Sequence, residues 1–330
     1  MKRKVIRQGH NTLTITLPSE WAKKFNVDAG HEINLDEVDG GLLLTTEKRD
    51  GDQKKVEIDI SGMDIPTIWK HFMAVYREGY DEVKIKFDSK YELESPYKYI
   101  TQHRFDSRYK KYKEKHSMSR VLQGFVDRFI GFEIVEHGKD YIVVKDMGEP
   151  TAKEFDNSLR RVFLLLKQMA EETLEAINKK DKSQLIMIHD IDINLDKFHD
   201  YCVRVLNKLE NKCQKKITLL FSTLYLTEML GDEFKDIAIH ILSDFKDSQF
   251  AHLKPLIKFV SEQIDSYYDL FYKYDKEKVN LISKLDQETY FGTPDYFKKF
   301  GEDEKELFYH LRMVGRYINA LTELRIEMEY

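Results

Sequence analysis

Apolar and polar residues alternate along the first part of the chain. Over residues 12–17, three apolar side chains alternate with three threonines, which is the period of a half-buried strand. A short helix is expected after Pro18, a second strand around 33–35 and, beyond a turn at 39–41, another strand at 42–44. This pattern predicts a small β domain at the N-terminus.

Strands and helices are mixed in the next hundred residues. Alternating apolar residues predict strands at 56–60 and 83–87, and helical spacing predicts a helix between them from 66 to about 78. The remaining elements expected here are a helix at 121–130 and strands at 132–135 and 141–144. The order of strand, helix and strand predicts an α/β unit.

From residue 152 onward the apolar residues follow the helical period of 3.6. The first helix keeps this spacing from Phe155 to Ile177. Further helices are expected at about 185–211, 215–245, 250–274, 276–290 and 302–328. Six helices with short breaks predict paired antiparallel bundles. The expected domains are therefore 1–50, 51–150 and 151–330.

Length and composition agree with a multidomain globular protein. A chain of 330 residues is too long for one ordinary core, and 42% hydrophobic with 34% charged residues does not indicate disorder. No apolar run approaches the roughly 18 residues of a membrane span, and the basic start is not followed by an apolar signal core. With only two cysteines, eleven residues apart, we expect a reducing, cytoplasmic setting and no membrane insertion.

Charge is distributed unevenly along an acidic chain. The net charge is −5, yet residues 1–24 carry six Lys/Arg and one acid, whereas residues 25–48 carry six acids and one lysine. A small domain with one positive face is therefore compatible with an acidic whole. Residues 97–120 hold eight Lys/Arg, two acids and four tyrosines. That stretch is either a solvated linker or an extension of a nucleic-acid surface.

Three acids recur every four residues in the helix expected at 215–245. Glu228, Asp232 and Asp236 fall on one helical face, where like charges at this spacing repel by roughly 0.2–0.5 kcal/mol per pair. A multivalent cation bound by their oxygens would compensate this repulsion. The alternative is a solvated acidic face, and Lys235 is the one neighbouring positive charge within the row.

The spacing of Glu228, Gly231 and Asp232 resembles the E-x-x-G-D metal-binding signature of PhoU proteins. The last helix repeats this frame around Gly315, and a motif in each of two tandem three-helix bundles is what the PhoU family implies. The resemblance also implies a divalent or iron ion, such as Fe, Zn, Mn or Mg. In the second frame Arg312 and Arg316 replace the acids and cannot ligate a metal, so they would bind an anion or the facing carboxylates.

Other acids could complete such a metal site. Asp190 and Asp192 match the family's acidic stretch in the second helix, but residues two apart cannot share a helical face, so at most one should join Glu228. Glu171 in the first helix is a further candidate ligand.

The N-terminal segment is similar to the swapped-hairpin domains of the AbrB/SpoVT type. The similarity is carried by Leu13 to Pro18, by Trp21-Ala22 and by the turn at Asp28-Ala29-Gly30. Such domains dimerise and bind DNA, and the alternative for the basic residues here is that they only keep a small dimer in solution. The residues that the similarity assigns to DNA are Lys2, Arg3, Lys4, Arg7, Asn11, Lys23 and Lys24.

The order of these modules, with a strand–helix–strand unit between them, resembles archaeal PhoU-like phosphate uptake regulators. It implies a homodimeric or larger transcriptional regulator of phosphate uptake that binds double-stranded DNA and senses a metal or a partner through its helices. The alternative is a metal-binding adaptor that regulates a phosphate ABC transporter or a signalling kinase by protein contact. An enzyme is disfavoured, because no nucleophile–base set, phosphate loop or paired Glu-x-x-His motif is present.

Overall fold

The computed structural model describes most of the chain as two compact units, Met1–Asp52 and a second unit that begins at Gln53. The described residues are 2–9, 11–38, 41–46, 53–90, 92–94, 115–148, 152–208, 214–244, 250–291, 298 and 300–330. None of the helices in these ranges combines the length and the apolar character that a membrane crossing requires. Most of the basic stretch at 97–120, and residues 39 and 40 of the predicted turn, lie outside the described residues.

The first unit consists of two antiparallel hairpins and one short helix. Strand β1 (Ile6–Gln8) pairs with β2 (Thr12–Thr14), and β3 (Ile33–Val38) pairs with β4 (Gly41–Thr46). Helix α1 (Ser19–Lys24) lies between the hairpins in sequence. After β1 the backbone turns through Gly9 with φ of 75°, a conformation that costs glycine little. The expected β domain is confirmed.

The first unit has no core of its own among the side chains that the structure describes. None of them is buried, and apolar residues such as Leu13 and Leu42 are 67% and 64% exposed. A segment of this size rarely folds stably without further burial of apolar surface.

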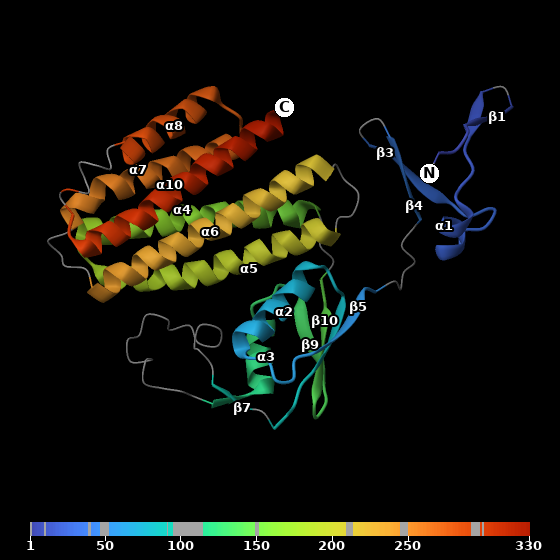
Figure 1. The fold of residues 1–330 in the computed structure, drawn as a ribbon, viewed down its shortest axis with the longest axis horizontal. Helices are drawn as coiled ribbons and strands as arrows, with labels where there is room; N and C mark the ends of the chain where they lie inside the picture. The colour runs from blue at the N-terminus through green and yellow to red at the C-terminus, as the bar shows by residue number, and fades with distance from the viewer. Residues whose placement is uncertain are drawn as a thin grey trace. The chain divides into compact units, whose positions relative to one another are not determined.

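The α/β part of the second unit is a four-stranded sheet in the order β5-β6-β10-β9 (Figure 1). Strands β5 (Lys55–Asp59) and β6 (Glu82–Lys86) are parallel and joined by α2 (Ile65–Arg77), which confirms the predicted strand–helix–strand unit. The side chain of Asp64 begins α2 by accepting a hydrogen bond from the backbone N–H of Thr67 at 2.9 Å. Strand β10 (Tyr141–Asp146) is antiparallel to both β6 and β9 (Phe132–His137).

Helix α3 (Met118–Val126) and α2 bury aromatic side chains against this sheet, among them Phe72 and Phe125. The predicted helix at 121–130 was wrong at both ends. The backbone N–H groups of Arg128 and Phe129 bond three residues back, so the chain tightens into turns before Gly131, whose φ is 87°. A further small pair of strands is formed by β7 (Glu92–Glu94) and β8 (Lys115–Ser117).

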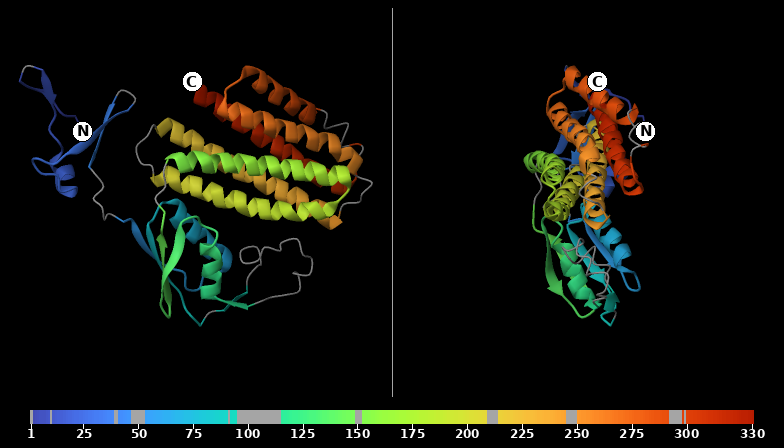
Figure 2. Two further views of the ribbon diagram at one scale, coloured as in Figure 1. Left: turned by 180° about the vertical axis from the view of Figure 1, so that it is seen from behind. Right: turned by 90° about the vertical axis from the view of Figure 1, so that its left-hand side faces the viewer.

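The helical part contains two successive sets of three long helices, which we call the first and second repeats (Figures 1 and 2). The first repeat consists of α4 (Ala152–Lys179), α5 (Ile186–Lys208) and α6 (Gln214–Asp244), with a short 3-10 helix, η3 (Lys182–Leu185), before α5. The second repeat consists of α7 (Phe250–Tyr272), α8 (Lys276–Phe291) and α10 (Glu302–Glu329). The predicted tandem three-helix bundles are confirmed.

The two repeats share one hydrophobic core. Helix α4 packs against α7, and α6 packs against α10, so each repeat covers an apolar face of the other. Leu195 of α5, Phe234 of α6 and Leu311 of α10 are among the fully buried members of this core. The period of 3.6 in the sequence therefore corresponds to one continuous apolar interior.

Candidate functional site

Helix α5 presents a row of three aspartates at four-residue intervals, and each contacts a basic side chain from another element. The carboxylate of Asp192 lies 3.0 Å from Nζ of Lys235 on α6. The other two pairs reach the α/β part, where Asp196 Oδ2 lies 3.1 Å from Nη2 of Arg128 and Asp200 Oδ1 lies 2.5 Å from Nη2 of Arg77. The row is therefore neutralised by the chain itself.

Lys235 is the most enclosed of the three cations that face this row. Its ammonium group bonds to Asp192 and also to Asp232, one turn earlier on α6. Burial alone would lower the pKa of Lys235, but the carboxylates of Asp192, Asp232 and Asp196 raise it above its usual value. Lys235 thus stays charged, and its positive charge is shared between two helices.

Glu228 lies on the same helix, one turn before Asp232. Burial raises the pKa of Glu228, and repulsion from Asp232 raises it further. His199 of α5 is near enough to lower it, and this ring is fully buried, with Nδ1 3.4 Å from Oδ1 of Asp200. Neither ring nitrogen of His199 forms a hydrogen bond with a residue that the structure describes.

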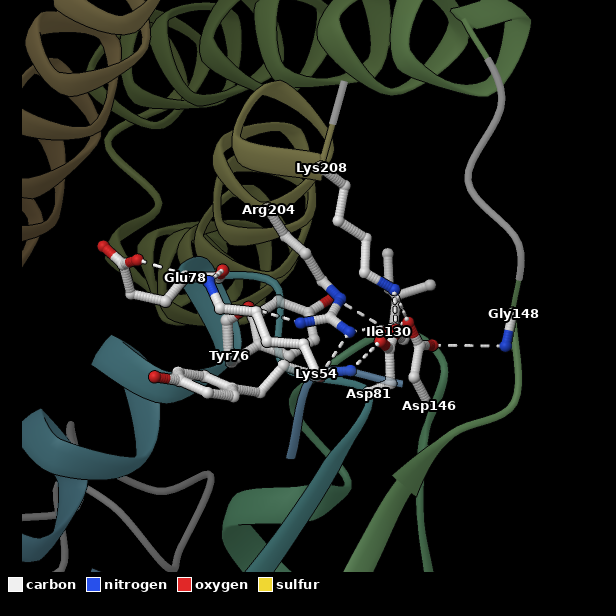
Figure 3. A network of polar contacts seen from close by, with 10 residues as sticks. Lys54, Tyr76, Glu78, Asp81, Ile130, Asp146, Gly148, Arg204 and Lys208 are labelled. Atoms are coloured by element: carbon white, nitrogen blue, oxygen red, sulfur yellow. Dashed lines mark hydrogen bonds and ion pairs between the residues drawn. The ribbon is translucent and has the colours of Figure 1, made fainter. Parts of the chain in front are cut away.

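A second ion network fixes the α/β part to α5 (Figure 3). Nη2 of Arg204 donates to Asp146 at 2.6 Å and to the carbonyl of Tyr80 at 2.7 Å. One turn later, Nζ of Lys208 donates to Asp146 and to Asp81, both at 2.7 Å. Arg204 is almost completely buried. Because this network and the pairs of Arg77 and Arg128 all join the two parts, they hold the sheet domain against the first repeat.

The structure brings together only part of the predicted metal set. Asp192, Glu228 and Asp232 gather where α5 meets α6, but the side chain of Asp190 is 64% exposed, as the helical spacing predicts. Glu171 is exposed on α4, and Asp236 lies close to His310 of α10 instead. Within the described ranges no three histidine, cysteine, aspartate or glutamate side chains are grouped as metal ligands.

The arrangement around Asp192 does not fit a metal ion, because the ammonium group of Lys235 lies between the carboxylates that would bind it. A lysine ammonium donates three hydrogen bonds and accepts none, so it competes with a metal for the same oxygens. Metal binding by Glu228, Asp232, Asp236, Asp190, Asp192 and Glu171 therefore stays a prediction.

The second repeat contains a matching arrangement. A Cβ atom on Gly231 of α6 would lie 3.8 Å from Oδ1 of Asp192, and one on Gly315 of α10 would lie 3.5 Å from Oδ1 of Asp286 on α8. Burial raises the pKa of Asp286, whereas the nearby Arg312 and Arg316 lower it. An anion or a facing carboxylate was expected as the partner of these arginines, and the structure supports the facing carboxylate.

The two repeats also exchange histidine–glutamate contacts where α6 meets α10. Nδ1 of His310 lies 2.7 Å from Glu233, and Nδ1 of His240 lies 3.8 Å from Glu306. The hydrogen bond to Glu233 is the main cause that raises the pKa of His310.

Sequence reasoning missed Arg77, Arg128, His199 and Arg204 as members of the site. Each comes from a segment with no recognisable motif, and the Arg77–Asp200 pair joins residues more than a hundred positions apart. Among the cations of the site, only Lys235 could be predicted from the sequence as a partner of Asp232, because the two residues lie one helical turn apart.

The residues predicted to bind DNA all lie on the surface of the first unit. Arg7 lies on β1 opposite Leu13 of β2, Asn11 lies between these strands, and Lys23 and Lys24 end α1. The full set of exposed residues is Lys2, Arg3, Lys4, Arg7, Asn11, Lys23 and Lys24.

These features define a class of protein with a small hairpin domain at the N-terminus and a helical domain of two three-helix repeats at the C-terminus. The sequence model of the family "Antidote-toxin recognition MazE, bacterial antitoxin" matches residues 6–52. The chain is thus similar to a MazE/AbrB-type domain over that segment.

A solved structure is similar to about half of the chain. The crystal structure of PhoU from Pseudomonas aeruginosa is matched over 54% of this chain and 96% of its own, with 13% identity and a TM-score of 0.44. A search among curated proteins found no match.

Proposed function

We propose that this protein is a cytoplasmic transcriptional regulator of phosphate uptake that binds double-stranded DNA through its N-terminal unit. The observation that carries the proposal is the exposed basic set that lies partly within residues 6–52, the segment that matches the MazE family, and partly just before it. Arg3, Arg7 and their neighbours are available for phosphate contacts, which supply most of the affinity of non-specific DNA binding. Phosphate uptake as the regulated process is inferred from the PhoU-like helical repeats.

The regulator acts as a homodimer or a larger assembly in this proposal. The first unit exposes Leu13 and Leu42 and buries none of its described side chains, so a second copy would complete its core. A dimer would also present the basic set twice, as DNA sites with two half-sites require.

The helical part receives the signal and does no chemistry in this proposal. Its polar residues form ion pairs between elements of the chain, and this use of charged side chains supports a scaffold role. A phosphate transporter or a signalling protein is the partner class that the PhoU resemblance suggests.

The direct test is a DNA-binding titration of the full chain at several salt concentrations. Neutralising Arg3 and Arg7 together, as Arg3→Gln and Arg7→Gln, should weaken binding to every sequence. The slope of log affinity against log salt should flatten by about two to four units per dimer. The matched control is Lys254→Gln with Lys258→Gln, which removes the same charge from an exposed face of α7 and should leave the slope unchanged.

No binding by the wild type at low salt, or equal slopes in the two double variants, would reject DNA binding. The adaptor hypothesis would then replace it. Light scattering on Leu13→Ser with Leu42→Ser separates the two parts of the proposal, because these changes remove apolar surface and should lower the oligomeric state without altering the charge of the basic set.

A further inference from the structure

Both repeats place an aspartate of their second helix against a glycine of their third helix, and both supply a cation there. In the first repeat the aspartate is Asp192 and the cation is Lys235, four residues after the glycine. In the second repeat the aspartate is Asp286, and Arg312 and Arg316 flank the glycine instead. The cation thus comes from different sequence positions but meets the same kind of carboxylate.

We propose that the helical domain carries its own cation in place of a metal ion, with Nζ of Lys235 occupying the position between Asp192 and Asp232. In the second repeat, Arg312 and Arg316 of α10 are the cations that lie near the carboxylate of Asp286. This proposal is independent of DNA binding, since it concerns only how the helical repeats balance their buried charge.

The charge balance of the first repeat supports an internal cation. Lys235 is buried and bonds to both carboxylates, so it meets the requirement that a charge removed from water be paired. Arg128 and Arg77 neutralise the next two aspartates of α5 in the same way. Each of the three aspartates of α5 is therefore paired with a cation of the chain, and this row of acids needs no external ion.

The carboxylate of Asp192 indicates that Lys235 occupies a position that a metal ion could otherwise take. Oδ1 of Asp192 is buried and has no hydrogen-bond partner among the residues that the structure describes, while Oδ2 contacts Lys235. Removing the lysine side chain would leave both oxygens of Asp192 and one of Asp232 facing the vacated space. Carboxylate oxygens suit Mn²⁺ or Mg²⁺. A smaller neutral residue at 235 should therefore create a metal site that the natural chain does not have.

The experiment compares thermal unfolding of the full chain with and without Mn²⁺ after treatment with a chelator. The melting temperature of the wild type should not change with Mn²⁺, and elemental analysis should find no bound metal. Lys235→Ala should melt lower by about 6–10 °C because it leaves Asp192 buried without a counter-charge. Mn²⁺ should recover at least half of that loss.

The matched control is Lys235→Ala combined with Asp192→Asn, which removes both charges and should neither melt as low nor respond to Mn²⁺. Lys235→Ser is a second small and neutral variant, in case Lys235→Ala does not fold. A stoichiometric metal in the wild type that Asp192→Asn removes would overturn the proposal. A Mn²⁺ response as large in the wild type as in the variants, or no response in either lysine variant, would overturn it as well.

Discussion

The two helical repeats differ in what surrounds their buried aspartate. In the first repeat the aspartate faces a lysine of α6, and the rest of α5 is covered by the α/β part through Arg77 and Arg128. In the second repeat the aspartate, Asp286, lies near two arginines of α10. It belongs to a shorter helix, α8, whose Leu281 is exposed. The comparison teaches that a positive charge lies near the glycine in both repeats, although it comes from a different sequence position in each.

The difference in surroundings predicts a difference in stability, and the largest effect should come from α5. Arg204→Met removes a buried guanidinium from Asp146 and from the carbonyls of Tyr76 and Tyr80. We expect a loss of about 3 kcal/mol in the free energy of unfolding, because breaking a buried pair leaves uncompensated polar groups. Denaturant titration measures it.

The control in the second repeat is Arg325→Met. Arg325 donates to the carbonyls of Leu270 and Phe271 near the end of α7 and lies closer to solvent. Its removal should cost about 1 kcal/mol. Equal losses in the two variants would show that the α/β part adds nothing to the first repeat.

The two glycines sharpen the comparison at the next level of effect. A Cβ atom on Gly231 would lie 3.1 Å from a methyl group of the buried Leu195, whereas the nearest atom at Gly315 is 3.5 Å away. We expect Gly231→Ala to destabilise by about 1–2 kcal/mol through overpacking. Gly315→Ala should instead stabilise by roughly 0.5–1 kcal/mol, because alanine loses less entropy in a helix. Chemical unfolding of both variants provides the check, and a stabilised Gly231→Ala would contradict the close packing of α5 on α6.

The smallest effect should occur where the repeats meet, and it should depend on pH. The pKa of His310 is raised above its ordinary value by Glu233, so the folded state binds the proton more tightly than the unfolded state. The contribution of the pair should be complete below about pH 6.5 and should be lost as pH rises through the folded pKa. Compared with His310→Gln, the wild type should gain at most about 1 kcal/mol at the acidic end.

Unfolding of the wild type and of His310→Gln between pH 5.5 and 8 measures this contribution. Glu233→Gln is the control and should remove the same pH-dependent difference. A gap between the wild type and His310→Gln that widens toward pH 8 would have the wrong sign and would exclude this pair as its cause.

The fold could be predicted from the sequence where the spacing of apolar residues alone determines a helix or a strand. The six long helices follow from apolar spacing between Phe155 and the last helix, and the parallel pair β5–β6 follows from the order of elements. The ends of α3 could not be predicted, because the backbone bonds that tighten the chain after Val126 have no distinctive residue pattern.

The candidate site was predictable only in its acids. A four-residue spacing places Glu228 and Asp232 on one helical face, as the structure has them. A two-residue spacing places Asp192 on a different face from Asp190, and this also agrees with the structure. The cations that neutralise the aspartates of α5 depend on tertiary packing, since Arg77 and Arg128 come from the α/β part. Repulsion along a helix indicates that some compensation exists, but it does not tell a metal ion from a distant arginine.

Helix α5 belongs to two cores at once, and this has a consequence for how the second unit unfolds. Its apolar face contributes Leu195 to the helical core, while Arg204 and Lys208 are bonded to the sheet domain. Melting of the sheet domain alone would remove Arg77 and Arg128 from two aspartates of α5. It would also leave Arg204 and Lys208 of α5 without their carboxylate partners, on a helix that is still folded. We therefore expect the shared helix to couple the two parts into one cooperative unit that melts in a single transition, even though its architecture has two layers.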